Sequence, residues 1–206
     1  MKKLGELNHF LGLEAERVND GIFIGQQGYA KRIVDRFGVH QGKVRSTPLD
    51  TNIRLKRDEE SLLANPRPYR SLVGSLLYLT ITRPDIAFAI GLVSRFMQEP
   101  RKPHLEAAKK IHKYVKTTLG MGLMYKYNAK VSLHGFTDTD FGGDLDDRKS
   151  TLGFVFLCGD TSISWCSKKK ATVLLSTTEE EYKASTSQPN NVYGFEDSLK
   201  TCSSNQ

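Results

Sequence analysis

The spacing of apolar residues changes once along the chain, at about Gly120, and this change constrains the fold more than any single motif. Before it, between residues 69 and 118, apolar residues recur at helical spacing in three consecutive segments. After it, short runs of alternating or wholly apolar residues are typical of β-strands. The sequence therefore predicts helices followed by a sheet, in an α+β or α/β arrangement.

Each of the three helical segments has its own signature. Residues 69–80 (YRSLVGSLLYLT) are apolar nearly all round, as in a buried helix. Residues 82–85 (TRPD) resemble a capping box with an early proline and open a second buried helix, which is expected to run to about Met97. The third helix opens at Pro103. Its lysines, which lie away from its apolar positions, are Lys109, Lys110, Lys113 and Lys116.

The residues before these helices predict a β-hairpin, a helix and a long connection. Residues 10–16 and 21–25 flank Val18, Asn19 and Asp20, and the pair Asp20-Gly21 is a turn signal typical of a hairpin. Residues 27–37 place their apolar side chains on one stripe and basic residues opposite, as an amphipathic helix does. Residues 40–68 have weak periodicity, and we expect them to form an extended connection.

Four runs near and after Gly120 predict short strands, at residues 122–126, 131–137, 152–158 and 162–166. The third run is apolar on both faces, so we expect it at the centre of a sheet. Serine and threonine at residues 176–178 then precede glutamates at residues 179–181, which is the pattern of a helix start. The second part of the chain is therefore expected to be a sheet followed by one helix.

The net charge of +7 is spread unevenly along the chain. Residues 1–130 contain 23 Lys and Arg against 12 Asp and Glu, whereas residues 131–206 contain 7 against 11. This asymmetry predicts two modules with different tasks. Basic surface is the usual footprint of binding to a phosphate backbone, although lysines that merely face solvent explain the same composition.

The sequence predicts neither a membrane-spanning segment nor an N-terminal secretion signal. No run of about 18 apolar residues occurs, and the N-terminal MKKLGELNHF lacks the apolar segment of a secretion signal. The three cysteines are an odd number without metal-ligand spacing, which suits a reducing compartment. We therefore expect an intracellular protein, in the cytoplasm or the nucleus, with no membrane partner.

Residues 134–147 (HGFTDTDFGGDLDD) gather five aspartates within ten positions of a basic chain. Like charges this close repel unless a cation neutralises them or water screens them. A calcium loop counted from Asp138 is excluded, because its twelfth position is Lys149 instead of a glutamate. Two explanations stay open: an acidic turn screened by Arg148 and Lys149, and a divalent-metal site that joins Asp138 to a glutamate of the following helix.

Seven runs of the sequence closely resemble the Pol polyprotein of copia-type LTR retrotransposons. They are MKKLGELNHFLGLEAE, GYAKRIVDRF, STPLD, YRSLVGSLLYLTITRPDIAFAI, VSRFMQEPRKPHLEAAKKI, FTDTDFGGDLDDRKSTLGF and ISWCSKKKATVLLSTTEEEY. The resemblance implies that residues 1–130 are the C-terminal part of a reverse transcriptase, with a primer-grip hairpin and thumb or connection helices. It also implies that residues 131–206 begin an RNase H domain, a truncated mixed sheet with one helix, in which residues 188–206 are a divergent tail.

The resemblance further implies roles for individual residues. Asp138 and Glu181 match the first two carboxylates of the RNase H site, where they would be Mg²⁺ ligands and catalytic residues. The residues matched to nucleic-acid contacts are Phe10, Leu11 and Gly12 in the primer grip and Lys168, Lys169 and Lys170 beside the bound hybrid. The implied partner is an RNA–DNA hybrid or duplex nucleic acid, and the oligomeric state is not predicted.

Two departures from the family pattern limit the activity that we expect. The polymerase's Y-V-D-D box does not occur, and Pro189 stands where the first RNase H helix should continue. We therefore expect a truncated, catalytically inactive Pol fragment with weak nucleic-acid binding. Two alternatives stay open: residual Mg²⁺-dependent cleavage of RNA in RNA–DNA hybrids, and a host-recruited interaction module, since residues 54–60 (RLKRDEE) faintly resemble the translocation motifs of secreted effectors.

Overall fold

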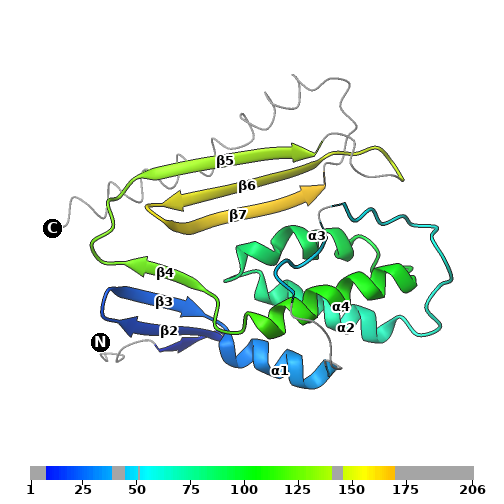
Figure 1. The fold of residues 1–206 in the computed structure, drawn as a ribbon, viewed down its shortest axis with the longest axis horizontal. Coiled ribbons are helices and arrows are strands. Elements are labelled where there is room, and N and C mark those ends of the chain that lie inside the picture. Colours follow the sequence, from blue (N-terminus) through cyan, green and yellow to red (C-terminus); the bar gives the residue numbers. More distant parts are fainter. Residues whose placement is uncertain (1–7, 39–44, 51, 141–145, 170–206) are drawn as a thin grey trace, which may run out of the picture.

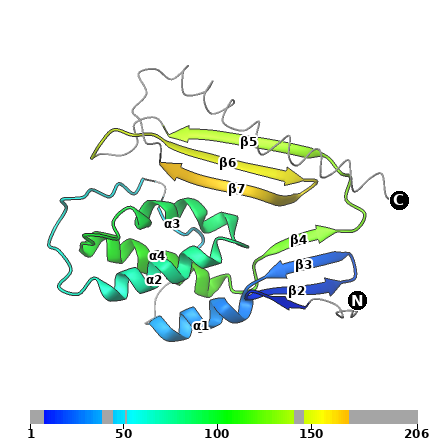
Figure 2. The ribbon, with the colours of Figure 1, turned by 180° about the vertical axis from the view of Figure 1, so that it is seen from behind.

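A computed structural model describes residues 8–38, 45–50, 52–140 and 146–169. This part of the chain has an α+β fold, in which two antiparallel sheets accompany a group of helices. Figures 1 and 2 show the three-stranded sheet lying along helix α3 (Ala87–Ser94), with the four-stranded sheet at one end of the helices. The predicted helix after residue 178 and the tail at 188–206 lie outside the described residues.

The four-stranded sheet is built on the hairpin that the sequence predicts. Its strands are β1 (His9–Phe10), β2 (Leu13–Val18), β3 (Gly21–Gly25) and β4 (Leu123–Lys126), in the order β1-β2-β3-β4. Val18 pairs with Gly21, so the turn between β2 and β3 consists of Asn19 and Asp20. The strand predicted at 122–126 therefore extends the N-terminal hairpin across nearly 100 residues of sequence.

The helices form the hydrophobic core. They are α1 (Gln27–Phe37), α2 (Arg67–Leu79), α3 and α4 (Lys102–Thr117). Residues that are fully buried among them include Leu76, Ile90, Ile111 and Val115. Burial of a side chain of this size stabilises the fold by about 1.5–3 kcal/mol, so this layer holds residues 27–117 together. The helices predicted at 27–37, 69–80 and from Pro103 are confirmed to within three residues.

The capping box predicted at residues 82–85 is wrong. A short 3₁₀ helix, η1 (Pro84–Ile86), forms there instead and leads into α3, which ends at Ser94, three residues before the predicted end. Thr82 does not cap a helix, because its hydroxyl donates to the side-chain oxygen of Gln26 at 3.0 Å. The carboxylate of Asp85 is likewise occupied by the guanidinium of Arg83. Thr82 and Asp85 therefore bind other side chains instead of capping a helix.

The second sheet contains β5 (Leu133–Asp140), β6 (Thr151–Cys158) and β7 (Thr161–Lys169). Its order is β5-β6-β7, so the run predicted to be central is central. Both pairs of strands are antiparallel, and the described residues therefore show none of the parallel pairing of the expected mixed sheet.

The second sheet packs onto the first part of the chain through β7, which contacts both α3 and β4. The indole of Trp165 donates to the carbonyl of Thr80 at 2.9 Å, and the hydroxyl of Tyr125 donates to the carbonyl of Ser162 at 3.3 Å. These bonds join the sheet to the helices and to β4. In the described ranges, every helix is too short or too polar to cross a bilayer.

Candidate nucleic-acid interface

Helix α4 presents a basic face to solvent. Lys109, Lys113 and Lys116 follow one another at spacings of four and three residues, so they share one side of the helix, and Lys110 lies next to them. The opposite side is buried against the core, with Ala108, Ile111 and Val115 among its contacts. The three lysines span about 10 Å at 1.5 Å per residue. We call Lys109, Lys110, Lys113 and Lys116 the lysine face.

The connection before α2 packs beside this face. The carboxylate of Asp50 accepts hydrogen bonds from Arg45 at 2.5 Å and from Lys110 at 2.9 Å. The bond from Lys110, followed by that from Arg45, lowers the pKa of Asp50 below its usual value. An open pocket of about 480 Å³ lies between the connection and α4, and Lys109 and Lys113 also line it. Arg45 therefore adds a fifth cation to the lysine face.

Acidic neighbours only partly neutralise this surface. Lys109 pairs with Glu106 at 2.8 Å, and both side chains are half or more exposed. Lys110 pairs with Asp50, which is itself shared with Arg45. Exposed ion pairs of this kind are weak, so a phosphate can displace the carboxylates. The surface around the pocket retains a net positive charge.

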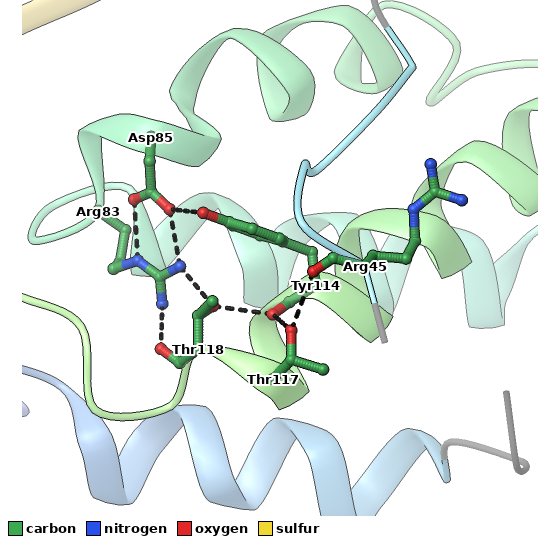
Figure 3. Close-up of polar contacts among 6 residues, drawn as sticks. All are labelled: Arg45, Arg83, Asp85, Tyr114, Thr117 and Thr118. Carbon is green, nitrogen blue, oxygen red and sulfur yellow. Dashed lines mark hydrogen bonds and ion pairs between the residues drawn. The ribbon is translucent and has the colours of Figure 1, made fainter. Parts of the chain in front are cut away.

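A buried polar network fixes the end of α4 that carries Lys113 and Lys116 (Figure 3). Arg83, whose side chain is 3% exposed, donates to the carboxylate of Asp85 and to the carbonyl and hydroxyl oxygens of Thr118. The hydroxyl of Tyr114 donates to the same carboxylate at 2.9 Å. The last turn of the helix is therefore bound to the loop at residues 80–86, and the lysine face is held in a fixed orientation.

The charges in this network are stabilised by one another. Burial alone would raise the pKa of the Asp85 carboxyl, but hydrogen bonds from Arg83 and Tyr114 and the charge of Arg83 lower it overall. Burial, and then the bond to Asp85, raise the pKa of Tyr114. Asp85 is thus ionised and Tyr114 protonated at neutral pH. The network supports the fold and has no free group for chemistry.

The residues matched to the primer grip form a tight turn on the surface of α2. Leu11 and Gly12 link β1 to β2, with φ angles of 48° and 75°. Positive φ at both positions is the pattern of a type I′ hairpin turn, and glycine favours it. The hydroxyl of Tyr78 donates to the carbonyl of Leu11 and anchors the turn. Phe10 and Leu11 remain more than half exposed, so they are free to contact a partner.

Asp138 lies on β5 with its side chain exposed. It pairs with Gly153, which pairs in turn with Ser167 on β7, so these three residues form one row across the sheet. Within the described ranges, no three His, Cys, Asp or Glu side chains gather closely enough to hold a metal ion. Glu181 lies outside those ranges. Of the two residues matched to the Mg²⁺ site, the structure therefore describes only Asp138.

The predicted lysine cluster is split by the pleat of β7. Lys168 and Lys169 are neighbours in a strand, so their side chains point to opposite faces of the sheet. Lys168 is exposed, whereas Lys169 pairs with Asp147 at 2.8 Å. Lys170 lies outside the described residues. Lys168 and Lys169 therefore lie on opposite faces of the sheet.

Two aspartates of the acidic cluster, Asp146 and Asp147, have specific partners. Asp147 pairs with Lys169 and, at 3.7 Å, with Lys149, which was one of the two cations expected to screen the turn. Asp146 accepts a hydrogen bond from the backbone N–H of Arg57 at 2.8 Å. These two residues stabilise the loop before β6, which supports the acidic-turn explanation for this part of the cluster. The contact with Arg57 spans 89 residues and leaves no signal in the sequence.

Comparison with known proteins places the chain in a class of retroelement proteins. It is 40% identical, over 87% of its length, to the retrovirus-related Pol polyprotein from transposon RE1 of Arabidopsis thaliana. It is 38% identical, over 89% of its length, to an uncharacterized mitochondrial protein of the same plant, of which it covers 76%. Over 57% of its length it is 42% identical to a secreted RxLR effector protein of Plasmopara viticola, of which it covers 83%.

The chain belongs to the family of copia-type retrotransposon Pol polyproteins. It spans 12% to 15% of the length of the three transposon polyproteins that it matches. No family model matches the sequence, and no solved structure matches the fold.

Proposed function

We propose that this chain is a Pol segment that binds the backbone of an RNA–DNA hybrid or duplex nucleic acid through the lysine face of α4. The observation that carries the proposal is the alignment of Lys109, Lys113 and Lys116 on one side of α4, where Lys109 and Lys116 are exposed and Lys113 is partly exposed. Duplex nucleic acid carries about one negative charge per 1.7 Å of helix axis, so a row of cations about 10 Å long meets several phosphates.

The strength of this binding follows from the number of contacts. Three or four lysines that neutralise one phosphate each give a slope of log affinity against log salt of about −3. Binding of this kind carries no sequence preference, because phosphates are the same at every position. We therefore expect weak, salt-sensitive association that does not depend on base sequence.

We further propose that residues 131–206 are an RNase H-like module without cleavage activity in this 206-residue chain. The antiparallel strands β5, β6 and β7, with Asp138 on the first of them, support the match to the start of such a domain. Two-metal hydrolysis requires several carboxylates that hold two ions about 4 Å apart. Only Asp138 and Glu181 match the family's carboxylates, and Pro189 stands where the helix that would carry Glu181 should continue.

A role as a secreted effector is less well supported. Within residues 54–60, Leu55 is buried, most of the other residues are exposed, and Asp58 pairs with Arg101 at 2.9 Å. The segment RLKRDEE also lacks the strict R-x-L-R order of the translocation motifs that it faintly resembles. The likeness to the effector of Plasmopara viticola covers 118 residues of a shared framework. We therefore rank nucleic-acid binding above an effector role.

The proposal is tested by replacing the lysines and measuring the affinity for a fluorescent RNA–DNA hybrid by anisotropy. The variant Lys109→Ala/Lys113→Ala/Lys116→Ala is expected to bind at least about tenfold more weakly, since each phosphate contact is lost. The matched control Lys109→Arg/Lys113→Arg/Lys116→Arg keeps the charges and is expected to bind like the wild type. Equal affinity of the alanine variant and the wild type would refute the proposal.

A further inference from the structure

A second surface, separate from α4, lies where the two sheets meet. Figures 1 and 2 show the β2–β3 turn, the end of β4, the start of β5 and the β6–β7 turn on the same side of the molecule. An open groove of about 860 Å³ runs between these segments. It is lined by residues of the β2–β3 turn, of segment 126–132, of β5 and of the β6–β7 turn. We call it the junction groove.

Two aromatic side chains in the junction groove are unusually exposed. Tyr127 is 57% exposed and Phe136 is 56% exposed, and both line the groove. Neither ring has an aromatic partner among the ring contacts of the described residues. Exposed rings in a groove are the platforms on which proteins stack the bases of single-stranded nucleic acid.

Basic and polar side chains lie along the same groove. Lys126, Lys130 and His134 contribute cations or hydrogen-bond donors, and Asn128 contributes an amide. The sequence of segment 125–130 (YKYNAK) thus alternates rings and lysines. This combination suits a ligand that carries both flat apolar rings and negative charges. An apolar protein segment would make use of the rings and leave the lysines without partners.

The walls of the groove are held in place by backbone hydrogen bonds. The N–H of Tyr127 donates to the carbonyl of Asp20 at 2.9 Å, and the N–H of Gly159 donates to the carbonyl of Ser132 at 2.8 Å. Gly159 has a φ of +59°, and a Cβ at this position would lie 3.3 Å from the carbonyl oxygen of Lys130. The close approach of the β6–β7 turn to segment 127–132 therefore depends on this glycine. A preformed groove loses little entropy on binding.

We propose that the junction groove binds single-stranded nucleic acid, with bases stacked on Tyr127 and Phe136 and phosphates beside Lys126 and Lys130. A duplex does not fit this chemistry, because its base faces are already stacked on one another. The inference goes beyond duplex binding by α4 and rests on different residues. It gives the chain two nucleic-acid surfaces, one for paired and one for unpaired strands.

Acidic residues limit the affinity of this groove, because Asp20 and Asp160 line it together with the lysines. Asp160 of the β6–β7 turn is 87% exposed and pairs with Lys126 at 3.7 Å, so it competes with a phosphate for that lysine. The substitution Asp160→Asn removes the competing charge and leaves the turn geometry set by Gly159. The variant is therefore expected to bind a single strand more tightly than the wild type.

The binding test measures the anisotropy of a short fluorescein-labelled oligothymidylate with the full 206-residue chain. Tyr127→Ala and Phe136→Ala are each expected to weaken binding by about fivefold or more, as expected for the loss of one stacked base. The control Tyr127→Phe keeps the ring and is expected to bind like the wild type. Unchanged affinity in both alanine variants, or no binding by the wild type, would overturn the proposal.

Two further measurements separate this groove from the lysine face. The variant Lys109→Ala/Lys113→Ala/Lys116→Ala should keep its affinity for the oligothymidylate while it loses affinity for a duplex. Irradiation of an oligonucleotide that carries 5-iodouracil should crosslink it to Tyr127 or Phe136, identified by mass spectrometry of the digested protein. Crosslinks confined to residues outside the groove would overturn the proposal even if duplex binding by α4 were confirmed.

Discussion

Arg83 donates two parallel hydrogen bonds to the carboxylate of Asp85, from Nε to Oδ1 at 2.9 Å and from Nη2 to Oδ2 at 2.8 Å. The guanidinium is buried and the carboxylate is partly exposed. The two residues are two positions apart in the sequence. Arg83 also donates to Thr118, and Asp85 also accepts from Tyr114, at the end of α4. The orientation of the lysine face therefore depends on a charge pair at residues 83–85.

The first prediction concerns this pair. Asp85→Asn removes the negative charge opposite a buried guanidinium and is expected to lower the free energy of unfolding by about 2–3 kcal/mol. The matched control is Asp50→Asn, which removes the partner of exposed cations and is expected to cost much less. Urea unfolding followed by circular dichroism measures both values. Equal losses in the two variants would show that the buried pair has no special role.

The second prediction concerns pH. Burial lowers the pKa of His104 and that of His112 below the ordinary value of 6.5. The unfolded chain then binds more protons than the folded chain as the pH falls below 6.5. The contribution of the two neutral histidines to the free energy of unfolding is therefore fully present above pH 6.5, and it is lost as the pH falls through their folded pKa values. His104 fits only as the neutral form, since its Nδ1 accepts the N–H of Arg101 at 3.0 Å.

Urea unfolding between pH 7.5 and 5.5 tests this dependence. The wild type is expected to become less stable toward the acidic end, and the variant His104→Gln/His112→Gln is expected to be less stable at pH 7.5 but to vary less with pH. The acidic groups with lowered pKa values, Asp50 and Asp85, stay ionised in this window. A wild-type stability that is constant across the window would contradict the burial of neutral histidines.

The third prediction concerns cleavage. In the presence of Mg²⁺ or Mn²⁺, the wild type and Asp138→Asn are both expected to leave the RNA strand of a labelled RNA–DNA hybrid intact, because too few carboxylates match the family's metal site. The assay is denaturing gel electrophoresis of the end-labelled RNA. Cleavage by the wild type that is absent from the Asp138→Asn protein would establish a working nuclease and refute the proposed inactivity.

Local patterns predicted most of the fold. The hairpin at 13–25, helix α1 and the central position of β6 each follow from residue spacing within about a dozen positions. The capping box at 82–85 failed because Thr82 and Asp85 have alternative partners, one of which is 56 residues away. The spacing of residues along the sequence indicates local geometry, but it does not indicate which of two polar partners a side chain binds.

The candidate sites were predicted less completely. Arg45 and Asp50 were not singled out, since their packing beside α4 brings together residues 60 positions apart in the sequence. The junction groove was also missed, because it is formed by turns from both sheets. A signal was nevertheless present, as the alternation of rings and lysines at residues 125–130 is a pattern of nucleic-acid binding. The exposure of Tyr127 and Phe136 became evident only in the folded chain.

The central claim is that the lysine face of α4 binds nucleic-acid phosphates, and the salt dependence of hybrid affinity tests it most directly. The wild type is expected to give a slope of log affinity against log salt of about −3, and Lys109→Ala/Lys113→Ala/Lys116→Ala a slope of about −1, because Lys110 remains. A slope that is the same in both proteins would show that other residues contact the phosphates and would contradict the account.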